Sequence, residues 1–237
     1  GKFARVKARL VIHGNQTQKY SFDEVKSPTA RQEAVKLMIA MMAKRLPGGR
    51  KFKGRSYDVT GAFLQNDIKG RTAAKQAKDP GYEAPAAIHL RLPDGRYAVL
   101  VAYVYGLKQA SYEFYCKLTE VLTSAGFVPT SDPCVFHLWD GEDVIITSVH
   151  VDDIFAIATN DHLLDRLDTA LAKVFESTNA VLTRHVGPKL SYLKMAIEQR
   201  DDGTVTVDQT LYVEKIVNQW GHGKVVGTEY PLVDPNE

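Results

Sequence analysis

Two adjacent carboxylates, Asp152 and Asp153, lie in the middle of an apolar stretch that runs from Val144 to Ala158. The residues on both sides are rich in Val, Ile and Phe, which is typical of β-strands. Neighbouring carboxylates in such surroundings are costly to desolvate and repel each other. A divalent cation removes both costs because it brings positive charge and prefers oxygen ligands. The pair therefore indicates a metal site, with a solvated acidic turn as the alternative.

A third carboxylate, Asp58, stands near the start of a second short β-type run, Tyr57 to Leu64. A lone Asp at the edge of a strand is usually structural. Three carboxylates from two strands, however, can hold two metal ions that activate a 3′-hydroxyl and stabilise a leaving pyrophosphate. The sequence therefore predicts two-metal phosphoryl transfer on one condition, which spacing alone does not establish: Asp58 and Asp152 must meet in space.

Four further segments accompany the acidic ones in order along the chain: Val6–Val11, Ser27–Arg31, Tyr105–Ala110 and Ser131–Pro133. Together with Tyr57–Leu64 and Val151–Ile154, they resemble the reverse transcriptases of Ty1/copia retrotransposons. The resemblance covers nearly the whole chain, from about Lys7 to Val233. One Asp-Asp turn is a weak signal, but six ordered motifs are specific.

The resemblance implies an RNA-directed DNA polymerase that extends a primer on an RNA or DNA template. It implies dNTP substrates and two Mg²⁺ ions, for which Mn²⁺ can substitute. The implied catalytic and metal-binding residues are Asp58, Asp152 and Asp153, with the Val59 carbonyl as a further metal ligand; nucleotide would contact Lys7, Arg9, Phe63, Gly106, Lys108 and Gln109, and primer or template would contact Tyr192 and Lys194. Phe63 would lie under the sugar and exclude a 2′-hydroxyl, or else belong to the core. Gly106 would allow a close backbone approach to the nucleotide.

Four departures from the family pattern concern primer handling and not the acids. His150 replaces a Tyr, and we expect it to pack beside the acidic turn. Ser111–Tyr115 stands where the family has Pro-Arg-Ala-Trp-Tyr, and Tyr192–Met195 where it has Phe-Leu-Gly-Ile. Residues Asp67 to Ala87 form an apparent insertion, as a loop or partly helical segment.

Two other classes of function stay open. A decayed or domesticated element could keep the fold only to bind nucleic acid, which the departures favour slightly. Intact acids argue against it, because a binding protein gains nothing from a repulsive acid cluster. A palm-fold enzyme of another kind, such as a nucleotidyl cyclase, would not need the copia-type Tyr105–Gln109.

Composition gives the class of protein and its setting. The 237 residues are 44% hydrophobic and 24% charged, which is ordinary for a globular protein of one domain or two subdomains. No stretch is long enough to span a bilayer, so we expect no membrane partner. Cys116 and Cys134 suit neither a disulfide framework nor a zinc site. We therefore expect an intracellular location, which the resemblance makes a cytoplasmic retroelement particle and also the nucleus.

The N-terminal part of the sequence also carries information. The start has no Met and no apolar core of a signal peptide, which predicts a segment of a longer polyprotein. Integrase, RNase H and capsid segments would then lie outside these residues. Residues 1–55 carry 14 Lys and Arg against 3 Asp and Glu, a net charge of +11, whereas the remainder carries 16 against 25. The basic end predicts contact with nucleic acid or triphosphate, with a solvated surface as the alternative.

Periodicity predicts an α+β fold, with an antiparallel sheet and helices on one face. The expected strands are 5–12, 57–64, 88–92, 97–104, 135–139, 144–149, 192–199 and 204–208. Four helices are expected: one after a capping box at 29–32, one from 111, one from 163 with Asn160 or Asp161 as its cap, and one from 212. By resemblance these form fingers (1–56 and 67–110, with the insertion at 67–87), palm (57–66 and 111–200) and a thumb-like segment with one short helix (201–237). Asp201 and Asp202 are expected in a hairpin turn.

Overall fold

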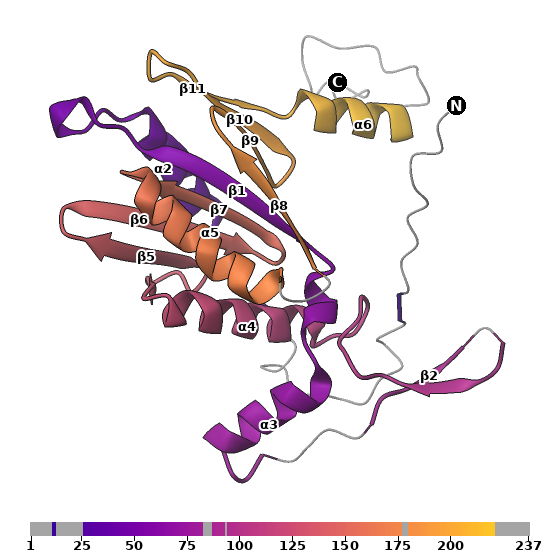
Figure 1. Cartoon of the computed structure of the whole chain (residues 1–237). Helices are drawn as coiled ribbons and strands as arrows, with labels where there is room; N and C mark the ends of the chain where they lie inside the picture. The colour runs from indigo at the N-terminus through magenta and orange to yellow at the C-terminus, as the bar shows by residue number, and fades with distance from the viewer. Residues whose placement is uncertain (1–10, 13–25, 83–86, 93, 177–179, 221–237) are drawn as a thin grey trace, which may run out of the picture.

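A six-stranded antiparallel sheet forms the centre of the molecule in a computed structural model that describes residues 11–12, 26–82, 87–92, 94–176 and 180–220 (Figure 1). Its strands, in spatial order, are β4 (Val128–Pro129), β5 (Val135–Asp140), β6 (Asp143–His150), β7 (Asp153–Ala158), β1 (Lys53–Thr60) and β8 (Val181–Val186). The predicted pairing of 135–139 with 144–149 is confirmed as the β5–β6 hairpin. The predicted α+β fold is confirmed as well.

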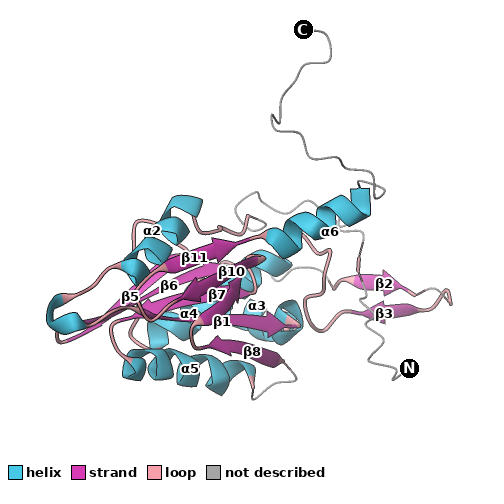
Figure 2. Ribbon diagram, turned by 90° about the horizontal axis from the view of Figure 1, so that it is seen from above, coloured by secondary structure: helices cyan, strands magenta, loops and turns pink. Residues whose placement is uncertain are grey.

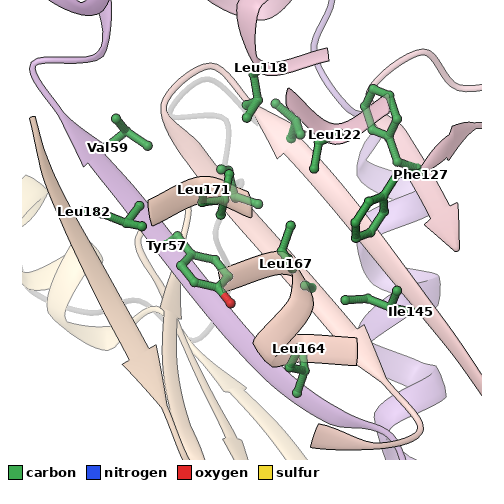
Figure 3. Packing of buried hydrophobic residues seen from close by; sticks show 14 of the residues in the cluster. Tyr57, Val59, Leu118, Leu122, Phe127, Ile145, Leu164, Leu167, Leu171 and Leu182 are labelled. Carbon is green, nitrogen blue, oxygen red and sulfur yellow. The ribbon is translucent and has the colours of Figure 1, made fainter. Parts of the chain in front are cut away.

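Both faces of the sheet are covered, which corrects the expectation of helices on one face. Helices α4 (Ala110–Ser124) and α5 (Asp161–Phe175) pack on one face, where Figure 3 shows leucines of both helices in one buried cluster with Tyr57 and Val59. Helix α2 (Gln32–Ala43) and a small sheet of β9 (Lys189–Tyr192), β10 (Met195–Gln199) and β11 (Val205–Asp208) cover the other. The reason lies in β7, where residues 154–158 are all buried, so that both of its faces need apolar cover.

The first helix begins differently from the prediction. The capping box at Thr29 is wrong: α2 begins at Gln32, and its N-cap residue Arg31 makes no side-chain capping bond. The Arg31 amide instead donates to Oδ2 of Asp132 at 3.0 Å, and the other carboxylate oxygen accepts from the Cys134 amide at 2.9 Å. Two of the motifs, Ser27–Arg31 and Ser131–Pro133, therefore meet at this carboxylate. The cap predicted for α5 is confirmed, since Asn160 Oδ1 accepts from the Leu163 amide.

The strand that carries Asp58 also begins earlier than predicted. It covers Lys53–Thr60 and ends at Gly61, whose φ of +75° turns the chain into a 3₁₀ helix, η3 (Ala62–Gln65). Asp58 therefore lies near the end of its strand. The predicted insertion contains a true helix, α3 (Ile68–Lys78), which Asp67 caps by accepting from the amides of Lys69 and Gly70.

Three hairpins and a last helix complete the regular structure outside the central sheet. Strands β2 (His89–Arg91) and β3 (Tyr97–Val99) form the predicted hairpin, shorter than expected, and it projects away from the central sheet (Figure 2). Tyr192 ends β9 and does not begin the next strand, so the predicted 192–199 strand is two strands joined by a tight turn. The β10–β11 hairpin around Asp201 and Asp202 is confirmed, and helix α6 (Thr210–Trp220) follows it.

Several expectations are not decided by the structure. The predicted strand 5–12, with Lys7 and Arg9, lies outside the described residues except for its last two positions. The division into fingers, palm and thumb stays a prediction. A short 3₁₀ turn, η2 (Pro47–Gly49), follows α2. No helix in the described part of the chain is both long and apolar enough to cross a membrane.

Candidate active site

The register of the sheet brings Asp58 beside Asp153. The two residues are direct partners in the antiparallel pairing of β1 with β7, and the Val59 amide donates to the Asp152 carbonyl at 3.1 Å. Asp152 lies in the tight connection between β6 and β7, where Val151 has a φ of +57°. A positive φ is rare for a β-branched residue and is found where the surroundings force it. The two acidic segments therefore meet, with Asp58 directly beside Asp153 and with the Asp152 carbonyl bonded to Val59, the residue after Asp58.

The acids belong to a row of polar side chains across four strands. His150 pairs with Asp153, Asp153 with Asp58, and Asp58 with Thr183 of β8. The Ser56 hydroxyl donates to the Ser191 carbonyl of β9 at 2.7 Å, so Ser56 points toward the small sheet, and Asp58, two residues on, points the same way. The row therefore lies on the face of the sheet that α2 and β9–β11 cover.

A pocket of about 330 Å³ opens at this row. Its walls include Asp58, Asp153, Thr183, His185, Leu193 and Lys194. The Thr60 hydroxyl donates to Asp58 Oδ2 at 3.0 Å, which fixes one oxygen of that carboxylate. Thr60, Thr183 and His185 were not found from the sequence, because their place beside the acids follows from the β1–β8 register and no local motif marks it.

Burial and the two neighbouring acids both favour the protonated form of Asp153. Burial, together with the nearby Asp152 and Asp58 carboxylates, raises its pKa to about 6. Within the described ranges, no three His, Cys, Asp or Glu side chains are arranged as a finished metal site. The chemistry of the set nevertheless fits Mg²⁺, since three carboxylates that disfavour each other's charge gain from a hard cation. The Val59 side chain is buried in the core, so Val59 can contribute only through its backbone.

Four of the predicted nucleotide-binding residues, Phe63, Gly106, Lys108 and Gln109, form a second group near the start of α4. The Phe63 ring is half-buried and lies 4.8 Å from the Tyr105 ring and 6.4 Å from the Phe114 ring, centroid to centroid. Lys108 is exposed, whereas Gln109 is only 6% exposed. The Gln109 Oε1 atom is buried and has no hydrogen-bond partner within the described residues. None of these facts tests their contact with nucleotide.

Gly106 also makes a close backbone approach within the chain, and its predicted approach to nucleotide stays a prediction. Its φ is +93°, and a Cβ there would lie 2.0 Å from the carbonyl oxygen of Ile12. The Ile12 amide also donates to the Tyr105 carbonyl at 2.9 Å. The close backbone approach is therefore made by the chain itself, at the end of the segment that contains Lys7 and Arg9.

A Gly106→Ala variant tests the importance of this approach. A Cβ cannot be accommodated 2.0 Å from the Ile12 carbonyl oxygen without a shift of the backbone, so we expect the Ile12 segment to be displaced. The apparent KM for nucleotide should then rise several-fold. Gly141→Ala is the matched control, since Gly141 also has a positive φ, +60°, but has nothing within 4 Å. Steady-state nucleotide kinetics on both variants make the comparison. An equal effect of the two substitutions would mean that backbone strain alone matters.

The two predicted primer or template contacts differ in exposure. The Tyr192 side chain is 1% exposed, stacks on Phe155 at 5.2 Å and has its hydroxyl 3.3 Å from Ser148 Oγ. Burial raises its pKa to about 12. Tyr192 therefore supports the pocket from the core, and its side chain has almost no surface left for a primer. Lys194 is exposed and lines the pocket, which keeps the prediction for it open.

His150 is half-buried beside Asp153, and its Nδ1 atom is buried without a hydrogen-bond partner in the described part of the chain. It lies beside the acidic turn as expected. It also belongs to the row of polar side chains that contains the acids.

Comparisons with known proteins agree with the residue pattern. A family model described as "Reverse transcriptase (RNA-dependent DNA polymerase)" matches residues 2–234. The chain is 27% identical over 235 residues to the retrovirus-related Pol polyprotein from transposon TNT 1-94 of Nicotiana tabacum, covering 98% of this chain and 16% of the polyprotein. It is 31% identical over 177 residues to the Pol polyprotein from transposon RE2 of Arabidopsis thaliana, covering 74% of this chain and 11% of that protein.

The chain belongs to the reverse transcriptase family, whose members are RNA-directed DNA polymerases and so nucleotidyltransferases. The predicted copia-type domain is thereby confirmed. Among solved structures, the chain is similar to a telomerase from Candida albicans, with a TM-score of 0.49 and 9% identity over 80% of this chain and 37% of that one. The chain spans between about a tenth and a sixth of the length of the Pol polyproteins that it matches.

Proposed function

We propose that this chain extends a primer on an RNA template, using dNTPs and two divalent cations, as the polymerase segment of a copia-like Pol polyprotein. The observation that carries the proposal is the pairing of Asp58 with Asp153 at the mouth of a pocket, with Asp152 joined to the same strand by a backbone hydrogen bond. Family membership supplies the reaction class, and the repulsion among the acids supplies the reason for a cation.

In this mechanism Asp58, Asp152 and Asp153 would hold the ions, with Mg²⁺ favoured by the all-oxygen donor set. When bound, such ions lower the pKa of the primer 3′-hydroxyl and neutralise charge on the departing pyrophosphate. The protein fixes the geometry in advance. The Val59 amide holds the Asp152 backbone, and the Thr60 hydroxyl orients Asp58. Preorganised charge of this kind needs no rearrangement during the reaction.

The partners follow from the same proposal. A primer–template would lie across the pocket, where Lys194 is the exposed cation, and the basic N-terminal end with Lys7 and Arg9 would face the triphosphate. Other segments of a Pol polyprotein would be covalent neighbours, in a cytoplasmic particle or the nucleus.

Primer extension on an RNA template in Mg²⁺ is the decisive experiment. Extension with dNTPs that stops when Mg²⁺ is removed would support the proposal. Tight binding of the primer–template without any extension, in Mg²⁺ or Mn²⁺, would instead identify a nucleic-acid-binding protein that keeps the fold.

Phe63→Val tests whether the half-buried ring selects the sugar. A ring under the ribose would exclude a 2′-hydroxyl by a clash, so its removal should lower the preference for deoxynucleotides at least about tenfold. Incorporation rates of dNTP and rNTP on one template measure the ratio. Phe114→Leu is the control, because Phe114 is fully buried in the neighbouring core and should affect only stability. An unchanged ratio in Phe63→Val would make Phe63 a core residue.

A further inference from the structure

The turn between β9 and β10 is held in an unfavourable backbone conformation. Tyr192 pairs with Met195, so Leu193 and Lys194 form a two-residue hairpin loop. Their φ angles are +47° and +62°. Asn and Gly are the residues that favour such a loop, and other residues persist in it only where their surroundings require them. The side chain of Lys194 is therefore a candidate for a contact that offsets the strain.

That contact is made with helix α6. Lys194 Nζ lies 4.7 Å from the centroid of the Tyr212 ring, within the range of a cation–π interaction. The same turn forms a wall of the pocket that contains Asp58 and Asp153. Lys194 thus joins two features that are far apart in the sequence, the acidic pocket and the C-terminal helix.

Helix α6 has few other means of attachment among the residues that the structure describes. None of its residues from Thr210 to Trp220 is buried, and Leu211 and Trp220 are 79% and 72% exposed. Its start is capped locally, since Asp208 Oδ1 accepts from the Thr210 amide at 2.8 Å. The helix lies beside the β9–β10 hairpin (Figure 1). Within the described residues, the contact between Lys194 and Tyr212 therefore joins α6 to the hairpin that lines the pocket.

We propose that Lys194 is a positioning residue that docks α6, through Tyr212, beside the acidic pocket, and that this docking sets how long the primer end is held there. The first half of the proposal stands on the contact alone. The second half rests on the proposed polymerase function. Lys in place of the glycine that the turn favours thus adds an attachment point for α6 at the cost of backbone strain.

Hydrogen exchange of the α6 amides, measured on the whole chain without nucleic acid, tests the docking. We expect exchange to be about two- to fivefold faster in Tyr212→Leu, because this factor corresponds to the free energy of one exposed cation–π contact. Tyr212→Phe keeps the ring and should exchange like the wild type. Lys194→Gly should relieve the turn but also speed exchange in α6. Adding Tyr212→Leu to it should cause no further increase, because the contact is already lost. Wild-type protection in Tyr212→Leu would overturn the proposal.

Release of a labelled primer–template tests the second half. We expect Tyr212→Leu to release it two- to fivefold faster than Tyr212→Phe, with single-nucleotide addition at saturating substrates unchanged. Faster exchange in α6 without faster release would overturn the link to the primer. If the wild type extended no primer at all, the proposed function would fail, but the exchange experiment would still decide whether Lys194 docks α6.

Discussion

Asp153→Asn is expected to abolish primer extension and, at the same time, to stabilise the metal-free protein at neutral pH. The variant loses a metal ligand from a site whose role is charge compensation, so extension should fall by orders of magnitude. It also loses a carboxylate that repels Asp58 and Asp152 across a short distance. A residue kept only for the fold would not show these opposite effects on activity and stability.

The pH dependence follows from the sign of the pKa shift. Burial, with the two neighbouring acids, raises the pKa of Asp153 from 3.8 to about 6, so the folded state binds more protons than the unfolded state between these values. Protonated Asp153 therefore contributes its full stabilisation below the pKa of the unfolded state. This stabilisation is lost as the pH rises through the pKa of Asp153 in the folded state. In the absence of metal, the wild-type free energy of unfolding should therefore fall by about 1–3 kcal/mol from pH 4 to pH 7, relative to Asp153→Asn.

Chemical denaturation over this pH range, with primer extension on the same samples, provides the measurement. Asp58→Asn should lose extension to a similar degree, and Asp201→Asn is the matched control because Asp201 is an exposed turn residue. Near-wild-type extension by Asp58→Asn or Asp153→Asn would refute the assignment of the acids. A Mg²⁺-dependent stabilisation of the wild type that is absent from Asp153→Asn would support it independently of activity.

The parts of this structure that the sequence predicted are those with a local signal. Helix α5 has leucines at helical spacing and its own Asn160 cap, and the strands around Gly141 alternate up to a turn residue. The acidic turn was visible because two carboxylates interrupt an apolar run. Whether Asp58 meets the acidic turn stayed open in the sequence, and the β1–β7 register places Asp58 beside Asp153.

What the sequence did not reveal depends on partners far along the chain. The cap of α2 comes from Asp132, 101 residues away from Arg31, so the local Thr29 pattern was misleading. Tyr192 resembles a surface aromatic at a strand end, but stacking on Phe155 makes it part of the core. The row from His150 to Thr183 is a property of strand register, which no single segment contains.

Two departures from the family pattern, the insertion and the altered Ser111–Tyr115 segment, meet at one buried carboxylate. Glu113 of α4 is 1% exposed, and it pairs with Arg71 at 2.9 Å and Lys75 at 2.6 Å, both from α3 in the insertion. The pairing explains why the inserted helix packs on α4, although none of its own residues is fully buried. The carboxylate also raises the pKa values of both cations, against the lowering effect of their burial.

Glu113→Gln should therefore destabilise the protein by about 3 kcal/mol, because it leaves the partly buried Lys75 without its carboxylate partner and Arg71 with Glu120 alone. Chemical denaturation at pH 7 measures the free energy of unfolding. Lys78→Ala is the control: its ion pair with Glu120 is exposed, and its loss should cost less than about 1 kcal/mol. Replacing Glu113, Arg71 and Lys75 together by Leu or Met should restore most of the stability, since a buried ion cluster can be exchanged for apolar packing. If the triple variant were as unstable as Glu113→Gln, the cause would be lost packing of α4 and not uncompensated charge.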